Sequence, residues 1–292
     1  MSYVDLHSHS TASDGTFAPV EVVRLAREAG LSGLALTDHD TIGGVEEAAA
    51  EAARLGITFL PGIEISAEYP HPGTLHILGY GIEPDSAVLR DMTAQLLAGR
   101  DNRNPKIIRR LQELGVAITM EELEVEAKQG NPELAHKPVG RPHIAAILLR
   151  KGYVSSMKQA FDKYLAPGGL AYFDKERLSP RRALEMIHES GGVPVLAHPV
   201  QLRTENDAQL DRVVKDLVDL GLAGIEVFHS DHTPEWVEKC SGLARRYGLL
   251  KTGGSDFHGA NKKDIALGCA RGQRVPREFL DALLERLAVS TR

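Results

Sequence analysis

Tyr3-Val4-Asp5-Leu6-His7-Ser8-His9-Ser10 joins a short apolar run to two histidines that are one residue apart. We predict that residues 3–7 form a strand. Alternate side chains of an extended chain point the same way, so His7 and His9 can reach one cation together. Short apolar runs with metal-binding side chains at their ends recur along the chain. This pattern indicates an α/β fold with a metal site at one end of its strands.

Short apolar runs bounded by Gly or Pro alternate with amphipathic segments of helical length. The predicted strands are residues 3–7, 34–37, 57–60, 76–80, 193–197, 225–228 and 249–252. The predicted helices are residues 19–29, 44–55, 180–189, 208–220 and 234–247. Several of these helices are followed by glycine, which commonly ends a helix. Alternating strands and helices predict a mostly parallel sheet or barrel, and seven strands favour the barrel.

One segment departs from this alternation. Residues 100–166 show helical pattern and no convincing strand. We therefore predict a catalytic barrel made of residues 1–99 and 167–292, interrupted by a small helical insertion that covers the substrate. The loops of the insertion carry the basic residues Arg100, Arg103, Lys106, His136, Lys137, Arg141 and His143.

The bulk composition excludes several classes of protein. The 292 residues carry a formal net charge of −6, so no overall basic field would attract nucleic acid. Cys240 and Cys269 are too few for a disulfide framework and fit a reducing cytoplasm. We expect a cytoplasmic protein, because no signal peptide and no apolar run long enough for a membrane span are present. No protein partner is evident.

Metal-binding side chains concentrate at the ends of the predicted strands. The nine candidates are His7, His9, Asp14, His39, Glu64, His76, His198, Asp256 and His258. A single such histidine is more often satisfied by local hydrogen bonds, but strand ends in a barrel converge on one face. Nine ligands exceed one tetrahedral site and predict two or three divalent ions. Mixed nitrogen and oxygen ligands suit Mn, Zn or Fe better than Mg or Ca alone.

Four further polar residues near strand ends have weaker claims to the site. Asp5 lies inside the first strand and is a candidate to orient a ligand histidine. Asp38 and Asp40 are candidates to cap the turn that follows the second strand. His229 ends the sixth strand and is a candidate to transfer a proton.

The order of these motifs resembles the polymerase-and-histidinol-phosphatase (PHP) superfamily. The similar segments are Asp5-Leu6-His7-Ser8-His9-Ser10, Ser13-Asp14-Gly15, Leu36-Thr37-Asp38-His39-Asp40, Pro61-Gly62-Ile63-Glu64-Ile65-Ser66 and Ser255-Asp256-Phe257-His258. Within the insertion, Gly140-Arg141-Pro142-His143-Ile144-Ala145 and Lys151-Gly152-Tyr153-Val154 are similar to one branch of that superfamily. That branch acts on nucleoside 3',5'-bisphosphates and on the 5' ends of short oligonucleotides.

The resemblance implies a distorted (βα)7 barrel with a trinuclear metal centre, most simply of manganese, with zinc or iron as alternatives. It implies that His7, His9, Glu64 and Asp256 hold one ion. Glu64 would be shared with a second ion that also takes His76 and His198. A third ion would take Asp14, His39 and His258.

The resemblance further implies a phosphomonoesterase in which a metal-bound hydroxide attacks phosphorus. We assign catalytic roles to Asp256, His229 and Glu64, with Asp256 or His229 handling the proton. Residues expected to contact the substrate are Asp14, His39, Arg100, Arg103, Lys137, Arg177 and Arg203. The basic members of this set would bind a second phosphate, although exposed Arg and Lys often serve only solubility.

Three other functions fit parts of the pattern. A histidinol-phosphate phosphatase would share the metal motifs and not the insertion. A metal-dependent amidohydrolase also begins with His-x-His on a barrel, but it typically bridges its ions with a lysine, where this chain has Glu64. A non-catalytic metal-binding PHP module would usually have lost ligands, and here all nine are present.

Overall fold

The computed structural model describes residues 2–129, 139–173 and 177–290. The chain divides into two compact units. The first comprises Met1–Thr93 with Arg177–Arg292, and the second comprises Ala94–Glu176. The predicted insertion, residues 100–166, lies inside the second unit. We describe each unit separately.

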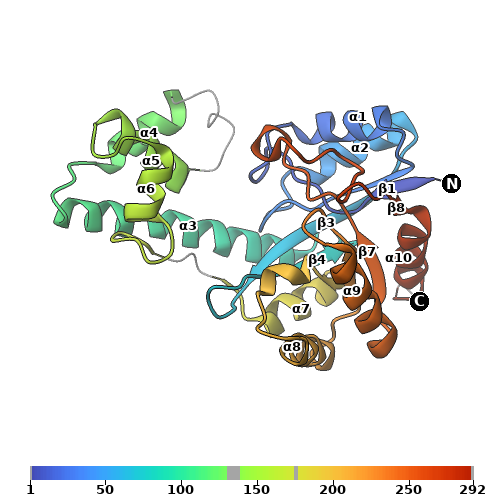
Figure 1. Ribbon diagram of the computed structural model, residues 1–292. Coiled ribbons are helices and arrows are strands. Elements are labelled where there is room, and N and C mark those ends of the chain that lie inside the picture. Colours follow the sequence, from blue (N-terminus) through green and yellow to red (C-terminus); the bar gives the residue numbers. More distant parts are fainter. Residues whose placement is uncertain (1, 130–138, 174–176, 291–292) are drawn as a thin grey trace. The chain divides into compact units, whose positions relative to one another are not determined.

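The first unit is built on one eight-stranded sheet that curls into a nearly closed barrel (Figure 1). Its strands are β1 Tyr3–Asp5, β2 Gly33–Leu36, β3 Thr58–Ala67, β4 Leu75–Tyr80, β5 Val193–Leu196, β6 Gly224–Phe228, β7 Leu250–Gly253 and β8 Val275–Pro276. Their order in the sheet is β7-β6-β5-β4-β3-β2-β1-β8. The seven predicted strands are confirmed. β3 extends seven residues beyond its predicted end, and β8 was not predicted.

Backbone contacts just beyond β1 and β7 bring the two sides of the barrel together. The N–H of Leu6 donates to the carbonyl of Gly253 at 3.2 Å, and the N–H of Asp256 donates to that of His7 at 2.9 Å. Buried Asp5 strengthens this junction, because its carboxylate accepts the N–H of Ser255 at 3.0 Å and the hydroxyl of Ser255 at 2.6 Å. The polar groups that follow β1 and β7 are therefore held side by side.

β4 runs antiparallel to both of its neighbours, which is a departure from a regular parallel barrel. The seven-residue connection from β3 to β4 is too short for a helical crossover, so β4 must reverse direction. The start of β4 therefore lies at the barrel end where the parallel strands finish. The register places His76 beside Ser66, two residues beyond Glu64.

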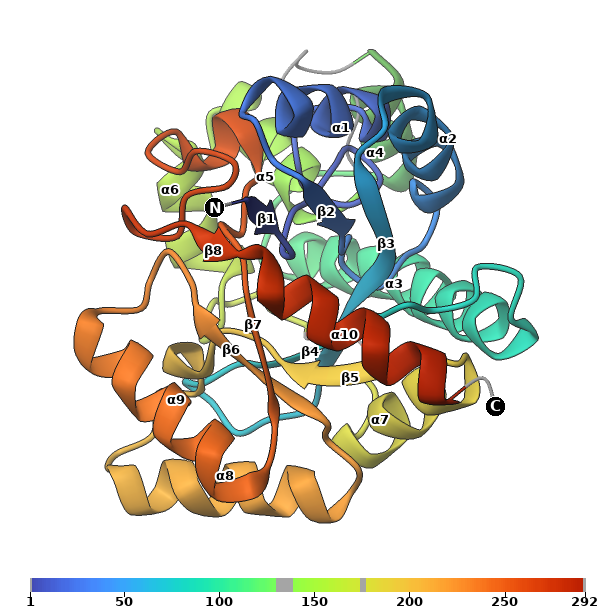
Figure 2. The same ribbon diagram turned by 90° about the vertical axis from the view of Figure 1, so that its right-hand side faces the viewer.

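Helices cover the outside of the barrel. They are α1 Pro19–Glu28, α2 Val45–Leu55, α7 Pro180–Glu189, α8 Asp207–Asp219 and α9 Pro234–Tyr247, and all five were predicted. α1 and α2 bury Val22, Val23, Ala48 and Ala52 against β2. α10 (Arg277–Ser290), which was not predicted, lies across the barrel end where the parallel strands begin (Figure 2). Its Leu280 and Leu283 join the interior core there, so the opposite end is left for the polar strand termini.

Among the described residues of the second unit, the regular elements are all helices, joined by turns and loops. Its elements are the later part of α3 (Ala87–Glu113), α4 (Met120–Gln129), α5 (Arg141–Arg150), α6 (Met157–Ala160) and a π-helical turn at Phe161–Leu165. These helices share their own apolar core, which includes Leu111, Ile118, Leu123, Ile144 and Leu148. No helix in the described part of either unit combines the length and apolarity that crossing a bilayer would require.

Replacing Asp5 with Ala is expected to destabilise the barrel by about 3 kcal/mol or more, because several buried donors would lose their acceptor. Urea unfolding of chelator-treated protein measures this effect without a contribution from metal binding. Asp219→Ala is the matched control, since Asp219 is exposed and forms an ion pair with Lys215 of its own helix. Equal unfolding midpoints for the two variants would show that Asp5 does not hold the barrel closed.

Candidate metal centre

The structure brings all nine predicted metal ligands to the barrel end opposite α10. They fall into overlapping groups whose nitrogen and oxygen atoms lie within 4.8 Å of one another. Each group contains three or four members. The groups are His9, Asp14, His39 and His258; His7, His9 and Asp256; His7, Glu226 and His229; His7, Glu64 and His198; and His39, Glu64 and His76. Residues more than 250 positions apart thus form one cluster.

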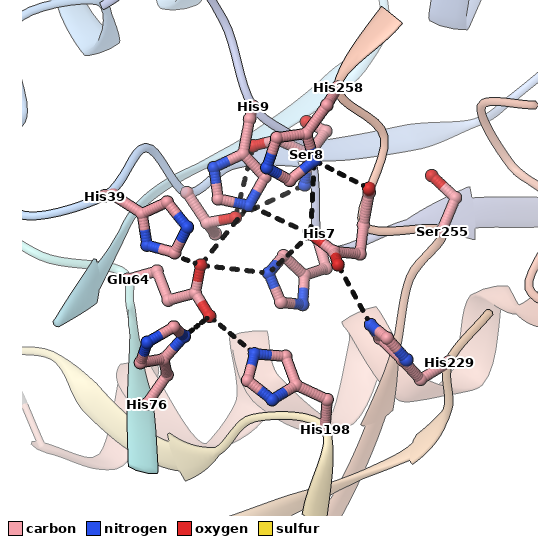
Figure 3. A network of polar contacts seen from close by, with 12 residues as sticks. His7, Ser8, His9, His39, Glu64, His76, His198, His229, Ser255 and His258 are labelled. Carbon is pink, nitrogen blue, oxygen red and sulfur yellow. Dashed lines mark hydrogen bonds and ion pairs between the residues drawn. The ribbon is translucent and has the colours of Figure 1, made fainter. Parts of the chain in front are cut away.

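Glu64 lies at the centre of this cluster (Figure 3). Its Oε1 atom lies 2.9 Å from Nδ1 of His76 and 2.8 Å from Nε2 of His198. Its Oε2 atom faces the other side, at 3.0 Å from Nδ1 of His39, with His9 at 3.3 Å and His7 at 3.4 Å. Because the two oxygens face different sets of imidazoles, this carboxylate has the geometry of a bridge between two ions.

Asp256 and His258 approach the cluster from the segment after β7. Oδ1 of Asp256 lies 3.2 Å from Nε2 of His9 and 3.6 Å from Nε2 of His7. Nε2 of His258 lies 3.2 Å from Oδ1 of Asp14. The backbones of Asp256 and His198 have positive φ angles of 57° and 25°. Such strained conformations persist where surrounding structure enforces them, often at functional sites.

Hydrogen bonds on the outer side of the rings determine which nitrogen faces the centre. Glu226, buried in β6, lies 3.0 Å from Nδ1 of His7 and also accepts the backbone N–H of His198 at 2.7 Å. Nδ1 of His258 donates to the carbonyl of Asp256 at 2.8 Å. Partners of this kind commonly orient metal-binding histidines and leave Nε2 available for the ion.

His229 has the opposite arrangement. Its Nδ1 atom accepts the N–H of Asp231 at 3.0 Å, so a neutral ring carries its proton on Nε2. That nitrogen lies 3.2 Å from Oδ2 of Asp256. His229 is therefore placed to hold a proton beside the cluster and is less suited than the other histidines to bind an ion through Nε2.

The centre of the cluster contains polar atoms that ordinary hydrogen bonds do not satisfy. Nε2 of His7, Nδ1 of His39 and Oε2 of Glu64 are buried and have no hydrogen-bond partner in the part of the chain that the structure describes. The last two are 3.0 Å apart and still form no hydrogen bond. Buried polar atoms are rarely left unpaired, so convergent lone pairs here fit divalent cations.

The electrostatics of the cluster also favour cations. Burial lowers the pKa of His9, but the carboxylates of Asp256 and Glu64 outweigh burial and raise it to about 10. Burial alone would raise the pKa of Glu64, yet His39, His76 and His7 hold it well below its usual value. Without metal, the anionic centre therefore retains protons on some of its imidazoles, and a bound cation would take their place.

The weaker predicted candidates hold segments around the site through backbone N–H groups and serine hydroxyls. Asp5 accepts the backbone N–H of His7 at 3.1 Å, next to the ring of a predicted ligand. Asp38 accepts Ser10 and Ser13 and so holds the loop that carries Asp14. Asp40 accepts the N–H of Ser66 at 2.8 Å.

The predicted phosphate anchors fall in both units. Arg177 directly precedes Leu178, which bridges to Ala67 at the end of β3. Arg203 is exposed just after the 3-10 turn Pro199–Leu202 that follows His198. Arg103 is largely buried in the second unit. The Arg100 side chain and the whole of Lys137 lie outside the described residues.

Two residues at the site were missed by sequence reasoning. Glu226 could have been noticed, because it is a charged residue within the apolar strand Gly224–Phe228. Lys262 ends the 3-10 turn Gly259–Lys262, and its ammonium group contacts Oδ2 of Asp256. The sequence around Lys262 gives no comparable indication of a functional role, because two adjacent lysines in a loop are typical of solvent-exposed surface.

A family model described as the PHP domain matches residues 5–215. This chain belongs to the PHP domain family. The matched region begins at the last residue of β1 and includes β2 to β5 and seven of the nine predicted ligands, with Asp256 and His258 beyond it.

Three curated relatives of this PHP chain are named for activities on phosphate esters. A 3',5'-nucleoside bisphosphate phosphatase of Chromobacterium violaceum is 36% identical over 91% of this chain and 91% of its own. A phosphoribosyl 1,2-cyclic phosphate 1,2-diphosphodiesterase of Eggerthella lenta is 36% identical over 87% and 94%. A 5'-3' exoribonuclease of Escherichia coli is 34% identical over 87% and 84%.

A solved structure from Bifidobacterium adolescentis has the same fold as this PHP chain. That protein, a suspected metal-dependent phosphoesterase, superposes with a TM-score of 0.78 and is 31% identical. The match covers 98% of this chain and 96% of the other. The distorted α/β barrel predicted from the sequence is therefore confirmed.

Replacing Glu64 with Gln is expected to remove at least one bound ion per chain, because an amide offers one oxygen ligand where the carboxylate offers two. Metal analysis of protein purified without chelator measures this loss. Glu51→Gln is the matched control, since Glu51 is also poorly exposed but pairs with Arg24 and Arg54. Equal metal content in both variants would contradict the bridging role of Glu64.

Binding of Mn²⁺ to metal-free protein at pH 8 is expected to release protons. With a pKa of about 10, His9 is protonated at that pH, and an imidazole must be neutral to bind a metal. Metal affinity should accordingly rise with pH. Calorimetry in buffers of different ionisation enthalpy counts the released protons. A binding heat that does not depend on the buffer would contradict this account.

Proposed function

We propose that this protein is a metal-dependent phosphomonoesterase that releases phosphate from nucleoside 3',5'-bisphosphates and acts on the 5' ends of short oligonucleotides. The observation that carries the proposal is the arrangement around Glu64, whose two oxygens face separate groups of imidazoles. Sites with adjacent divalent ions are typical of phosphoester hydrolysis. The activities of the bisphosphate phosphatase and exoribonuclease relatives support the choice of substrate.

The nine ligands are sufficient for two or three ions, and we propose manganese, with zinc or iron as alternatives. His7, His9, Glu64 and Asp256 would hold one ion. Glu64 would share a second ion with His76 and His198, while Asp14, His39 and His258 would hold a third. Divalent ions at such a centre lower the pKa of bound water and offset the charge of phosphoryl oxygens.

The proton chemistry falls to His229 and Asp256. Nε2 of His229 carries a proton toward Oδ2 of Asp256, at the edge of the ligand cluster. Asp256 can accept a proton from the attacking water and pass it to the oxygen of the departing alcohol, while the neutral ring of His229 keeps its Nε2 proton and donates to Oδ2. Asp256 keeps this ring oriented while its Oδ1 atom faces His9.

The second phosphate of a bisphosphate needs an anchor of its own. Arg177 and Arg203 belong to the barrel unit: Arg177 precedes Leu178, which bridges to the end of β3, and Arg203 follows the turn after His198. Arginine recognises phosphate by charge and by paired hydrogen bonds. We assign these two residues to the second phosphate. Arg100, Arg103 and Lys137 of the helical insertion are further candidates, with the insertion acting as a substrate cap. Asp14 and His39 are assigned to contact with the substrate from the metal side.

A matched substrate panel tests the proposal. We expect the Mn²⁺-loaded protein to release phosphate from 3',5'-bisphosphoadenosine at least about tenfold faster than from 5'-AMP, because one additional charged anchor is worth about a factor of ten or more. Histidinol phosphate, a 5'-phosphorylated oligonucleotide and a cyclic phosphodiester complete the panel.

A preference for another substrate of the panel would point to a different function. Preference for histidinol phosphate would keep the metal centre and remove the second-phosphate anchor. Preference for the cyclic diester would favour an activity like that of the Eggerthella lenta relative. Absence of turnover by fully loaded protein on every member would refute the proposed function.

A further inference from the structure

Lys262 occupies a position beside the metal centre that neither the motifs nor the ligand groups explain. Its ammonium nitrogen contacts Oδ2 of Asp256, and its side chain is 36% exposed. The adjacent Lys263 is exposed and lies just after the same 3-10 turn. One lysine of the pair therefore reaches the cluster, while the other points away into solvent.

The turn that carries Lys262 is attached to the loop that carries Asp14. The N–H of Ala260 donates to the hydroxyl of Thr16 at 2.9 Å, and the side-chain amide of Asn261 donates to the carbonyl of Asp14 at 2.6 Å. Gly259 has a φ of +64°, and a Cβ atom there would lie 2.1 Å from the Thr16 hydroxyl. This close approach requires glycine, so the backbone below Lys262 is held in place.

The two oxygens of Asp256 have different surroundings. Oδ1 faces the imidazoles of His7 and His9, which is the side of the predicted ions. Oδ2 faces Nε2 of His229 and the ammonium group of Lys262. Lys262 and His229 thus contact the same oxygen of Asp256. The other oxygen of this carboxylate faces the candidate metal ligands His7 and His9.

Charge balance then indicates what Lys262 binds. An ammonium group and a divalent ion on opposite oxygens of the same carboxylate repel each other, and a single negative charge does not compensate both. A phosphate dianion lying between them would supply the missing charge. Lysine offers three donors as a compact charge, and Asp256 is the one ion-pair partner that Lys262 has among the described residues.

We propose that Lys262 binds the phosphate monoester at the metal centre, donating to a phosphoryl oxygen next to Asp256. This inference rests on the proposed function for its choice of ligand. It makes Lys262 a direct substrate contact that is distinct from the arginines assigned to the second phosphate.

The test uses inorganic phosphate and Mn²⁺-loaded full-length protein. Lys262→Met removes the charge and keeps the length of the side chain, Lys262→Arg keeps the charge, and Lys263→Met is the matched control. Calorimetry measures the dissociation constant of phosphate, and metal analysis measures Mn²⁺ per chain. Loss of one charged hydrogen bond is expected to weaken phosphate binding by about tenfold to a hundredfold in Lys262→Met.

Lys262→Arg is expected to retain most of the affinity, and Lys263→Met to bind phosphate like the wild type, with Mn²⁺ content unchanged in all three. Unchanged phosphate affinity in Lys262→Met would overturn the proposal. Loss of Mn²⁺ in that variant, with normal phosphate affinity in the chains that remain loaded, would also overturn it and make Lys262 a positioning residue for Asp256. If the wild-type protein released phosphate from no substrate of the panel, the proposed function would be refuted. The titration with inorganic phosphate tests the role of Lys262 separately, because it requires no turnover.

Discussion

A single buried carboxylate, that of Glu64, organises the polar end of this barrel. A carboxylate with no solvent exposure is costly unless positive partners surround it. Here five imidazoles approach its two oxygens, and they come from the ends of β1, β2, β4 and β5. The buried carboxylates raise the pKa of His9 in the metal-free site. The same negative charge favours the binding of cations. The barrel places these groups together, and its closure by Asp5 and its neighbours keeps them there.

The reversal of β4 is the feature that completes the centre. In a barrel with only parallel strands, the first residues of a strand lie at the end remote from the active site. His76 stands at the start of β4, and it reaches Glu64 only because the short connection after β3 turns the strand around. α10 fills the remote end with leucine side chains. The apolar end of the barrel therefore contributes to the core, and the polar end carries the ligand cluster.

The partners around the ligands divide the chemistry among the residues. Glu226 contacts Nδ1 of His7 and leaves Nε2 facing the cluster, whereas the backbone N–H of Asp231 donates to Nδ1 of His229 and directs the ring proton toward Asp256. Lys262 approaches the same carboxylate from the turn tied to the Asp14 loop. Oδ1 of Asp256 therefore faces the candidate ligands His7 and His9, whereas Oδ2 faces His229 and Lys262, to which we assign roles in proton transfer and phosphate binding. In the proposed hydrolysis, the candidate metal ligands and the groups assigned to proton and phosphate therefore contact different oxygens of one carboxylate.

The sequence by itself determined the positions of the seven main strands, the five outer helices and the nine candidate ligands. These features are local: strand and helix periods, glycines after helices, and polar residues at strand ends can be recognised within a few positions. Other features were decided by tertiary structure alone, among them the direction of β4, the closing helix α10, the nitrogen that each histidine presents, and the contacts of Glu226 and Lys262. They depend on groups far apart in sequence, such as His7 and Glu226, which are 219 positions apart. A side chain's protonation and partner are set by the charges that folding brings within a few ångströms, and no local pattern records them.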